Sequence, residues 1–265
     1  MGQMSFLKRL FGFEKKASTL PIAKPVLSSE AMAMIESEAI DAVEITLVES
    51  VSFSRLGGKP LLPPDFAWPT TKRKGKDKGF NFLAQIDLSE VNDERLPLKG
   101  YLYFFFLFTD LPFECRVWFV QGDANEFREL LPPASKAAPS IEFEPNFIKF
   151  SSVRTYPPEE SEAFRRLNLS EADAEAYEDF FFEVSSDDHL LGHPDPTQFE
   201  MEGECHDAYP GISKSPSDWT LLLQVGENES TDAYWGDCGK AYFWIRHEDL
   251  ANHNFDRVYF TVQFL

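Results

Sequence analysis

Side chains that could bind a metal or move a proton gather in one stretch of this 265-residue chain, which contains Asp187, Asp188, His189, His193 and Asp195. Imidazole and carboxylate groups four residues apart could hold zinc, manganese or non-haem iron. Pro194 and Pro196 exclude a regular helix here, so the two histidines do not share a helical face. We therefore favour a polar loop with one histidine packed against a sheet, and we assign no metal ligand.

Two further segments contain nucleophilic residue types. Cys205-His206-Asp207 has the three residue types of a catalytic triad, but neighbours in sequence point apart and cannot form a relay. Trp235-Gly236-Asp237-Cys238-Gly239 is the better candidate for a ligand-binding loop, because its glycines permit unusual backbone angles beside a carboxylate, a thiol and an indole. A tight turn before the next strand explains the same glycines and is the favoured interpretation.

Two glutamines stand in apolar strand-like segments, Gln85 in Phe82–Leu88 and Gln224 after Leu221-Leu222-Leu223. A buried amide must satisfy both its donors and its acceptor. If the two amides meet, they could bind a small ligand. The favoured alternative is that each bonds the backbone of a neighbouring loop.

The surroundings of the two glutamines are the same, which indicates an internal duplication. In each case a glycine follows after 15 residues and a tyrosine after 18, which are Gly100 and Tyr103 in the first case and Gly239 and Tyr242 in the second. We expect two pseudo-symmetric copies, 51–155 and 184–265, joined by an acidic helical segment, 156–183. Residues 1–50 would form a leader followed by a helix and a strand.

The elements that must position these residues follow from periodicity. Apolar alternation predicts strands at 43–47, 82–88, 101–108, 116–120 and 258–264. Capping residues predict helices from Ser28 or Ser29 to Ser37, from 159 to 167, and from 171 to 182 with Ser170 as N-cap. We expect the basic run 72–79 to be a charged loop tip. The predicted fold class is α+β, predominantly antiparallel β with a few helices.

Charge excludes some partners. The net charge is −19, and 16 Asp and Glu stand against two Arg between Tyr156 and Tyr209. Such a field repels nucleic acid and anionic lipid, and it either steers a basic protein toward the chain or simply maintains solubility, which is the commoner explanation. Glu171, Glu175 and Asp179 are the partner-binding candidates in this stretch.

No apolar run reaches the length of a membrane span, and the first residues do not form a secretory signal. Cys115, Cys205 and Cys238 are an odd number without metal-finger spacing, so we expect reduced thiols in the cytoplasm. Phe6, Leu7, Leu10 and Phe11 share one helical face, which leaves open a weak contact of the leader with a membrane surface.

Several motifs occur in order along the chain: Leu56-Gly57-Gly58-Lys59-Pro60, Trp68-Pro69, Phe82-Leu83-Ala84-Gln85-Ile86, His189-Leu190-Leu191-Gly192-His193-Pro194 and Trp235-Gly236-Asp237-Cys238-Gly239. With them, the chain from about Phe53 to its end resembles the YwqG-like family, a bacterial domain of unknown function. The resemblance implies an α+β fold with internal duplication. It implies no activity.

Two functions are compatible with these observations. The first is a cytoplasmic binding protein whose acidic face docks a basic partner, as an antidote to a basic toxin would. The second is an enzyme or small-ligand binder with a pocket between the copies, using His189, Asp237, Gln85 and Gln224. The sequence does not decide whether the protein is an enzyme and implies no particular cofactor.

Overall fold

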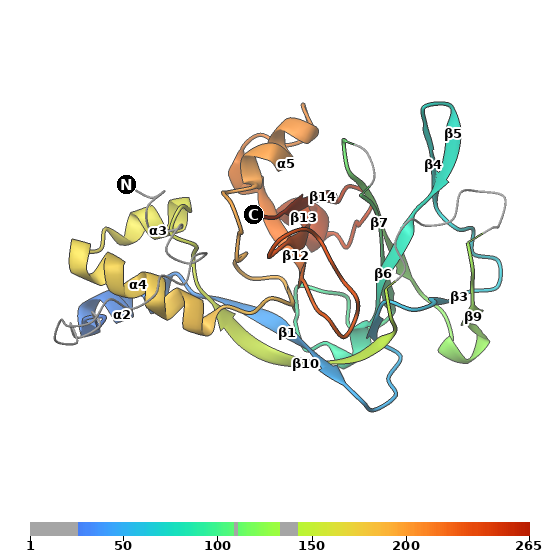
Figure 1. Ribbon diagram of the computed structural model, residues 1–265, viewed down its shortest axis with the longest axis horizontal. Coiled ribbons are helices and arrows are strands. Elements are labelled where there is room, and N and C mark those ends of the chain that lie inside the picture. The colour runs from blue at the N-terminus through green and yellow to red at the C-terminus, as the bar shows by residue number, and fades with distance from the viewer. Residues whose placement is uncertain (1–25, 109–110, 133–142) are drawn as a thin grey trace, which may run out of the picture.

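The computed structural model describes residues 26–108, 111–132 and 143–265. Within them, ten strands form one sheet in the order β14-β13-β12-β11-β1-β10-β2-β6-β7-β8, and every neighbouring pair is antiparallel. The sheet curls until its outer strands meet, where Cys115 Sγ of β8 lies 3.2 Å from the carbonyl oxygen of Val258 beside β14. The molecule is therefore a nearly closed barrel with three helices extending from one end (Figure 1).

The barrel strands are β1 (Ile40–Val48), β2 (Arg55–Leu56), β6 (Asn81–Asp87), β7 (Tyr101–Leu107), β8 (Glu114–Val120), β10 (Asn146–Thr155), β11 (His189–Leu190), β12 (Trp219–Gly226), β13 (Lys240–Arg246) and β14 (Tyr259–Gln263). Outside the barrel, β3 (Leu61–Leu62) pairs with β9 (Arg128–Glu129), and β4 (Thr70–Arg73) with β5 (Lys76–Gly79). The helices of the described residues are α2 (Ser29–Ser37), α3 (Glu162–Leu167), α4 (Glu171–Val184), α5 (Glu202–Ala208) and α6 (His247–Ala251). The expected antiparallel β fold with a few helices is confirmed.

Aromatic side chains fill the barrel. The rings of Phe104 on β7 and Phe243 on β13 meet at 5.2 Å, and Phe243 lies 4.8 Å from Phe260 on β14. Edge-to-face and tilted contacts of this kind stabilise beyond the area that they bury. Because they join strands from both ends of the sheet, these rings hold the barrel closed.

Both β7 and β13 are also covered on their outer face. Outside β7, Tyr103 and Phe105 pack in a cluster with Trp68. Outside β13, Tyr242 and Trp244 pack beneath α5. Strands buried on both faces lose the apolar and polar alternation of a half-buried strand, which accounts for the continuous apolar runs in the sequence.

The longest ladder joins β1 to β10 from Ile40 opposite Thr155 to Val48 opposite Phe147. This ribbon leads from the barrel to α2, α3 and α4, which we call the helical module (residues 26–39 and 156–185) (Figure 1). Ser28 caps α2, and Ser170 caps α4 by accepting from the Asp173 amide at 3.1 Å. The predicted caps are confirmed, because a cap needs only residues within one turn.

Other expectations differ from the structure. The basic run 72–79 lies in the hairpin β4–β5, which turns at Lys74 and Gly75, both with positive φ. The prediction of a loop tip was wrong, because this turn pairs two polar strands that show no apolar alternation. The leader and its apolar face lie outside the described residues. No helix within the described ranges is long and apolar enough to cross a membrane.

Candidate functional site

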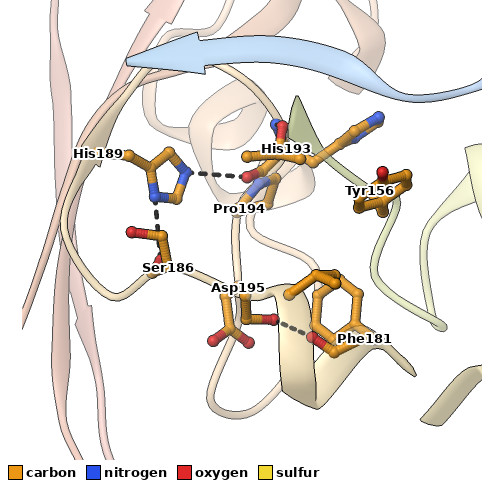
Figure 2. Close-up of a pocket in the computed structure, with 10 residues that line it drawn as sticks. Tyr156, Phe181, Ser186, His189, His193, Pro194 and Asp195 are labelled. Atoms are coloured by element: carbon orange, nitrogen blue, oxygen red, sulfur yellow. Dashed lines mark hydrogen bonds between the residues drawn. The ribbon is translucent and has the colours of Figure 1, made fainter. Parts of the chain in front are cut away.

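His189 is fixed by the backbone around it. The two-residue strand β11 places it between β1 and β12, where 1% of its surface is exposed. Its Nδ1 lies 3.1 Å from the Ser186 carbonyl oxygen and its Nε2 3.0 Å from that of His193 (Figure 2). Burial lowers the pKa of His189, because the charged imidazolium is disfavoured away from water. Since both nitrogens face carbonyl oxygens, the ring has no nitrogen left for a metal or substrate.

The pocket beside His189 is small. His193, Asp195, Tyr156 and Phe181 are among its lining residues, and its volume is about 10 Å³. The His193 ring contacts the Glu38 carbonyl oxygen at 2.8 Å through Nε2, and burial lowers its pKa as well. A cavity of this size has room for about one water molecule. It does not admit a substrate.

Asp187 and Asp195, which lie close to His189 in the sequence, both pair with a lysine. Lys240 at the start of β13 is 14% exposed and contacts Asp187 at 2.8 Å and Asp195 still more closely. Burial alone would lower the pKa of Lys240, but the two carboxylates outweigh it and raise the pKa. The ammonium therefore holds the loop 186–198 in place through these two ion pairs. Because it stays protonated, it is not activated as a nucleophile. Sequence reasoning missed it, although a lone lysine opening an apolar strand was a usable signal.

Asp188 faces the barrel side of the same loop. Its carboxylate accepts from the Gly226 amide at 2.8 Å, and burial raises its pKa to about 6. Among the described residues, no three His, Cys, Asp or Glu side chains lie close enough to hold a metal ion.

Gln224 also holds this loop. Its Oε1 accepts from the Asp195 amide at 2.9 Å, and its Nε2 donates to the carbonyl oxygens of Ser186 and Asp187 at 3.0 and 3.1 Å. His189 and Gln224 are thus cross-strand neighbours that fix the same loop from β11 and β12.

Gln85 makes a similar set of contacts elsewhere, with one carbonyl oxygen on its Nε2 where Gln224 has two. Its Oε1 accepts from the Leu61 amide at 2.8 Å and its Nε2 donates to the Phe53 carbonyl oxygen at 2.6 Å. In the sheet Gln85 lies opposite Tyr103, whereas Gln224 lies opposite Tyr242, and the two tyrosines belong to separate outer clusters. Each glutamine bonds the backbone of the loops beside its own strand, and the two side chains do not converge.

The candidate side chains of the loop 235–239 do not lie together. Trp235 is 1% exposed, packs in the barrel core and donates from Nε1 to the Gly226 carbonyl oxygen at 3.2 Å. Asp237 and Cys238 are exposed in a turn, where Cys238 has φ 51°. The indole therefore points into the core, away from the carboxylate and the thiol. The arrangement is that of a turn leading into β13.

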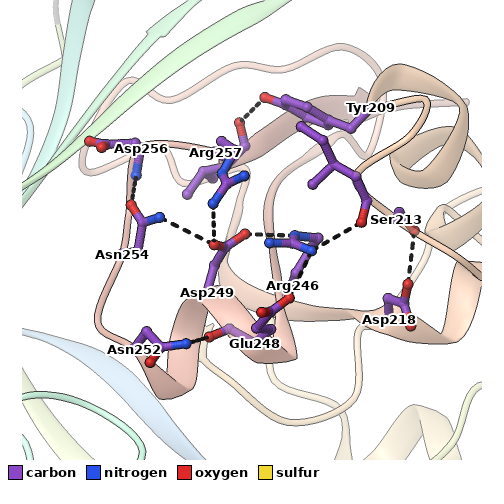
Figure 3. Close-up of polar contacts among 12 residues, drawn as sticks. Tyr209, Ser213, Asp218, Arg246, Glu248, Asp249, Asn252, Asn254, Asp256 and Arg257 are labelled. Atoms are coloured by element: carbon purple, nitrogen blue, oxygen red, sulfur yellow. Dashed lines mark hydrogen bonds and ion pairs between the residues drawn. The ribbon is translucent and has the colours of Figure 1, made fainter.

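A buried charge network lies at α6 (Figure 3). The Asp249 carboxylate, 4% exposed, accepts from Arg246 Nε at 2.7 Å and from Arg257 at 2.9 Å. Arg246 is itself 8% exposed and also donates to the Ile212 carbonyl oxygen at 3.1 Å. The network ties β13, α6 and the segment after α5 together, and all its charges are engaged in these contacts.

The remaining candidates lie on α4. They are Glu171, Glu175 and Asp179. Together with Glu183, which was not among the candidates, they are spaced four residues apart and exposed, so the four form a line along one side of the helix, which we call the acidic stripe. The opposite side buries Tyr177 in the small core of the helical module. Within the described residues, three of the four make no ion pair: Glu171, Glu175 and Glu183.

Residues 54–263 match the model of a protein family described as a domain of unknown function (DUF1963). The chain belongs to this family. The match contains the barrel from β2 to β14 together with α3 to α6, and it leaves out α2 and the central strand β1. No curated protein matches the chain. Family membership gives no activity, so the function must be argued from the residues of this chain.

Proposed function

We propose that this protein binds a basic segment of a partner protein through the acidic stripe of α4. The observation that carries this proposal is the spacing of the four carboxylates. Like charges at i and i+4 destabilise a helix by about 0.2–0.5 kcal/mol per pair. Glu183 adds a negative charge at the helix C-terminus, where the helix dipole disfavours it. The stripe weakens the helix that carries it, and a cationic partner would relieve that repulsion.

Both positive charges of the helical module are already paired. Arg165 pairs with Glu200 at 3.0 Å, and Arg166 with Glu38 at 2.9 Å. The arginines of α3 therefore do not neutralise the stripe. Phe182, which is 64% exposed, lies on α4 between Asp179 and Glu183. These features suit a segment rich in Lys and Arg that also carries an apolar side chain.

The test compares two variants with the same loss of charge. The stripe variant carries Glu171→Gln, Glu175→Gln, Asp179→Asn and Glu183→Gln. The control variant changes four exposed acids of the barrel half of the molecule, none of them in an ion pair among the described residues: Asp65→Asn, Glu94→Gln, Glu229→Gln and Asp256→Asn. Each protein captures partners from lysate of its own cells at low and high ionic strength, with quantitative mass spectrometry of what is retained.

We expect the wild type and the control variant to retain one basic protein at low salt and to release it at high salt. Its affinity for the stripe variant should fall by about tenfold or more, since each exposed charge pair contributes up to about 1 kcal/mol. Equal capture by the two variants would refute the proposal. The alternative of a catalytic pocket has less support, because the pocket beside His189 holds only about 10 Å³.

We also propose that residues 51–155 and 184–265 are two copies of one unit, as in the YwqG-like proteins that the sequence resembles. The matching contacts of the two glutamines support this. So do irregularities at the same place in β6 and β12, at Leu83 and Leu222. The sheet order is consistent as well, because β2-β6-β7-β8 on one side corresponds to β11-β12-β13-β14 on the other.

A further inference from the structure

The first residues of the chain have the chemistry that the acidic stripe would bind. Residues 4–16, which we call the leader segment, contain one acidic residue, Glu14, among several basic and apolar ones. The basic residues are Lys8, Arg9, Lys15 and Lys16. The apolar residues are Met4, Phe6, Leu7, Leu10, Phe11 and Phe13. In a chain of net charge −19, this segment is cationic and apolar, as the ligand of the stripe should be.

The described chain begins beside the stripe. The Ser28 amide donates to the Asp173 carboxylate at 2.8 Å. Asp173 lies in the first turn of α4, in the same turn as Glu171 at the start of the stripe. Leu27 packs against the core that contains Tyr177 of α4. The residues before Val26 therefore join the helical module at the end of α4 where the stripe begins.

The length of chain before Val26 allows the leader segment to reach the whole stripe. From Glu171 to Glu183 the helix rises by about 18 Å. Residues 17–25 connect the leader segment to the described chain and span up to about 30 Å when extended. A tethered segment binds at an effective concentration of the order of millimolar. Contacts that would hold a separate peptide only weakly are therefore sufficient here.

We propose that the leader segment occupies the acidic stripe of its own chain and competes there with the partner. This inference rests on the function proposed above, because it concerns the regulation of the same site. Glu171, Glu175 and Glu183 make no ion pair within the described residues and can accept the basic side chains. Phe182, which is 64% exposed on α4, offers an aromatic surface to the apolar ones.

The hairpin β4–β5 is the other strongly basic segment, with Lys72, Arg73, Lys74, Lys76 and Lys78 against one acid, Asp77. It extends from the end of the molecule opposite the helical module (Figure 1). Within one molecule the hairpin therefore does not reach the stripe, and it provides a matched control for the leader segment.

Trypsin reports whether the leader segment is covered, because it cleaves after the four basic residues. The assay follows cleavage in the full chain by mass spectrometry, with rates given relative to a synthetic peptide of residues 1–25 under the same conditions. We expect the wild type and the control variant of four barrel acids to be cut slowly at low salt. The stripe variant should be cut about threefold faster or more, because the segment is no longer held. The wild type should lose its protection at high salt.

A second measurement removes the charge of the leader segment instead. The leader variant carries Lys8→Gln, Arg9→Gln, Lys15→Gln and Lys16→Gln. Its matched control carries Lys72→Gln, Lys74→Gln, Lys76→Gln and Lys78→Gln in the hairpin. At low salt the leader variant should capture about threefold more partner than the wild type, and the hairpin variant the same amount as the wild type.

Equal cleavage of the wild type and the stripe variant would overturn the inference, as would equal partner capture by the wild type and the leader variant. Protection that grows with protein concentration would overturn it too, since it would place the segment on a second copy. So would protection seen only with vesicles of phosphatidylcholine and phosphatidylserine, which would place it on a membrane surface. Circular dichroism checks the fold of each variant, and the salt dependence of the wild type keeps the test decisive if the stripe variant does not fold. If no variant retains a partner, the function proposed above fails, whereas the cleavage rates still decide this inference.

Discussion

Removing the carboxylate of Asp249 should cost about 3 kcal/mol of unfolding free energy. Asp249 and Arg246 are 4% and 8% exposed and meet at 2.7 Å. Breaking a buried pair by deleting one partner costs about 3–5 kcal/mol, because the other charge stays buried. Arg246 keeps the Ile212 carbonyl oxygen and Glu248, and Arg257 is 39% exposed and can turn to water. Asp249→Ala should therefore fall at the lower end of that range.

The assay is urea unfolding at neutral pH, followed by tryptophan fluorescence and circular dichroism, whose transitions must coincide for a free energy to be defined. Glu248→Ala is the matched control, since Glu248 also pairs with Arg246, at 3.2 Å, but is 74% exposed. An exposed pair contributes about 1 kcal/mol or less. Asp249→Asn, which keeps the shape and loses the charge, should lie between the two.

A loss of this size requires that Arg246 cannot reach water once its partner is gone. If Asp249→Ala destabilised the protein no more than Glu248→Ala, Arg246 would be hydrated in solution, and the burial argument would be refuted. A loss well above about 5 kcal/mol would also contradict it, since the pair alone does not supply that much.

Two further predictions concern the loops held by side chains. Gln85→Leu and Gln224→Leu should each lower the free energy of unfolding by about 2 kcal/mol or more in the same assay, because each leaves backbone groups of a loop unpaired. A loss below about 0.5 kcal/mol would contradict this and show that water hydrates those groups. Asp188 has a pKa of about 6 in the folded protein, against an ordinary value of 3.8. The folded form therefore binds a proton more readily than the unfolded form, and the contribution of Asp188 to the free energy of unfolding falls as pH rises from about 4 to 6. Asp188→Asn should remove that dependence, gaining up to about 3 kcal/mol relative to wild type across this window, and parallel pH profiles of the two proteins would contradict the assignment.

Elements specified by neighbouring residues could be predicted from the sequence. The caps at Ser28 and Ser170 and the alternation of 82–88 each depend on contacts within a few positions, and the structure has α2, α4 and β6 there. Three members of the acidic stripe, Glu171, Glu175 and Asp179, were also visible, because a helix places residues four apart on one side. The hairpin β4–β5 was missed because its strands are polar on both sides.

Only the tertiary structure decided which candidate side chains are used by the fold. The sequence left open whether the two glutamines and His189 bind a ligand or only neighbouring loops, and Lys240 was not among its candidates. The partners of the two amides and the ammonium lie 24 to 53 residues away, and those of the imidazole lie on a loop that β11 orients. Such contacts form only when the sheet brings together residues far apart along the chain, and no local pattern of residue types encodes them.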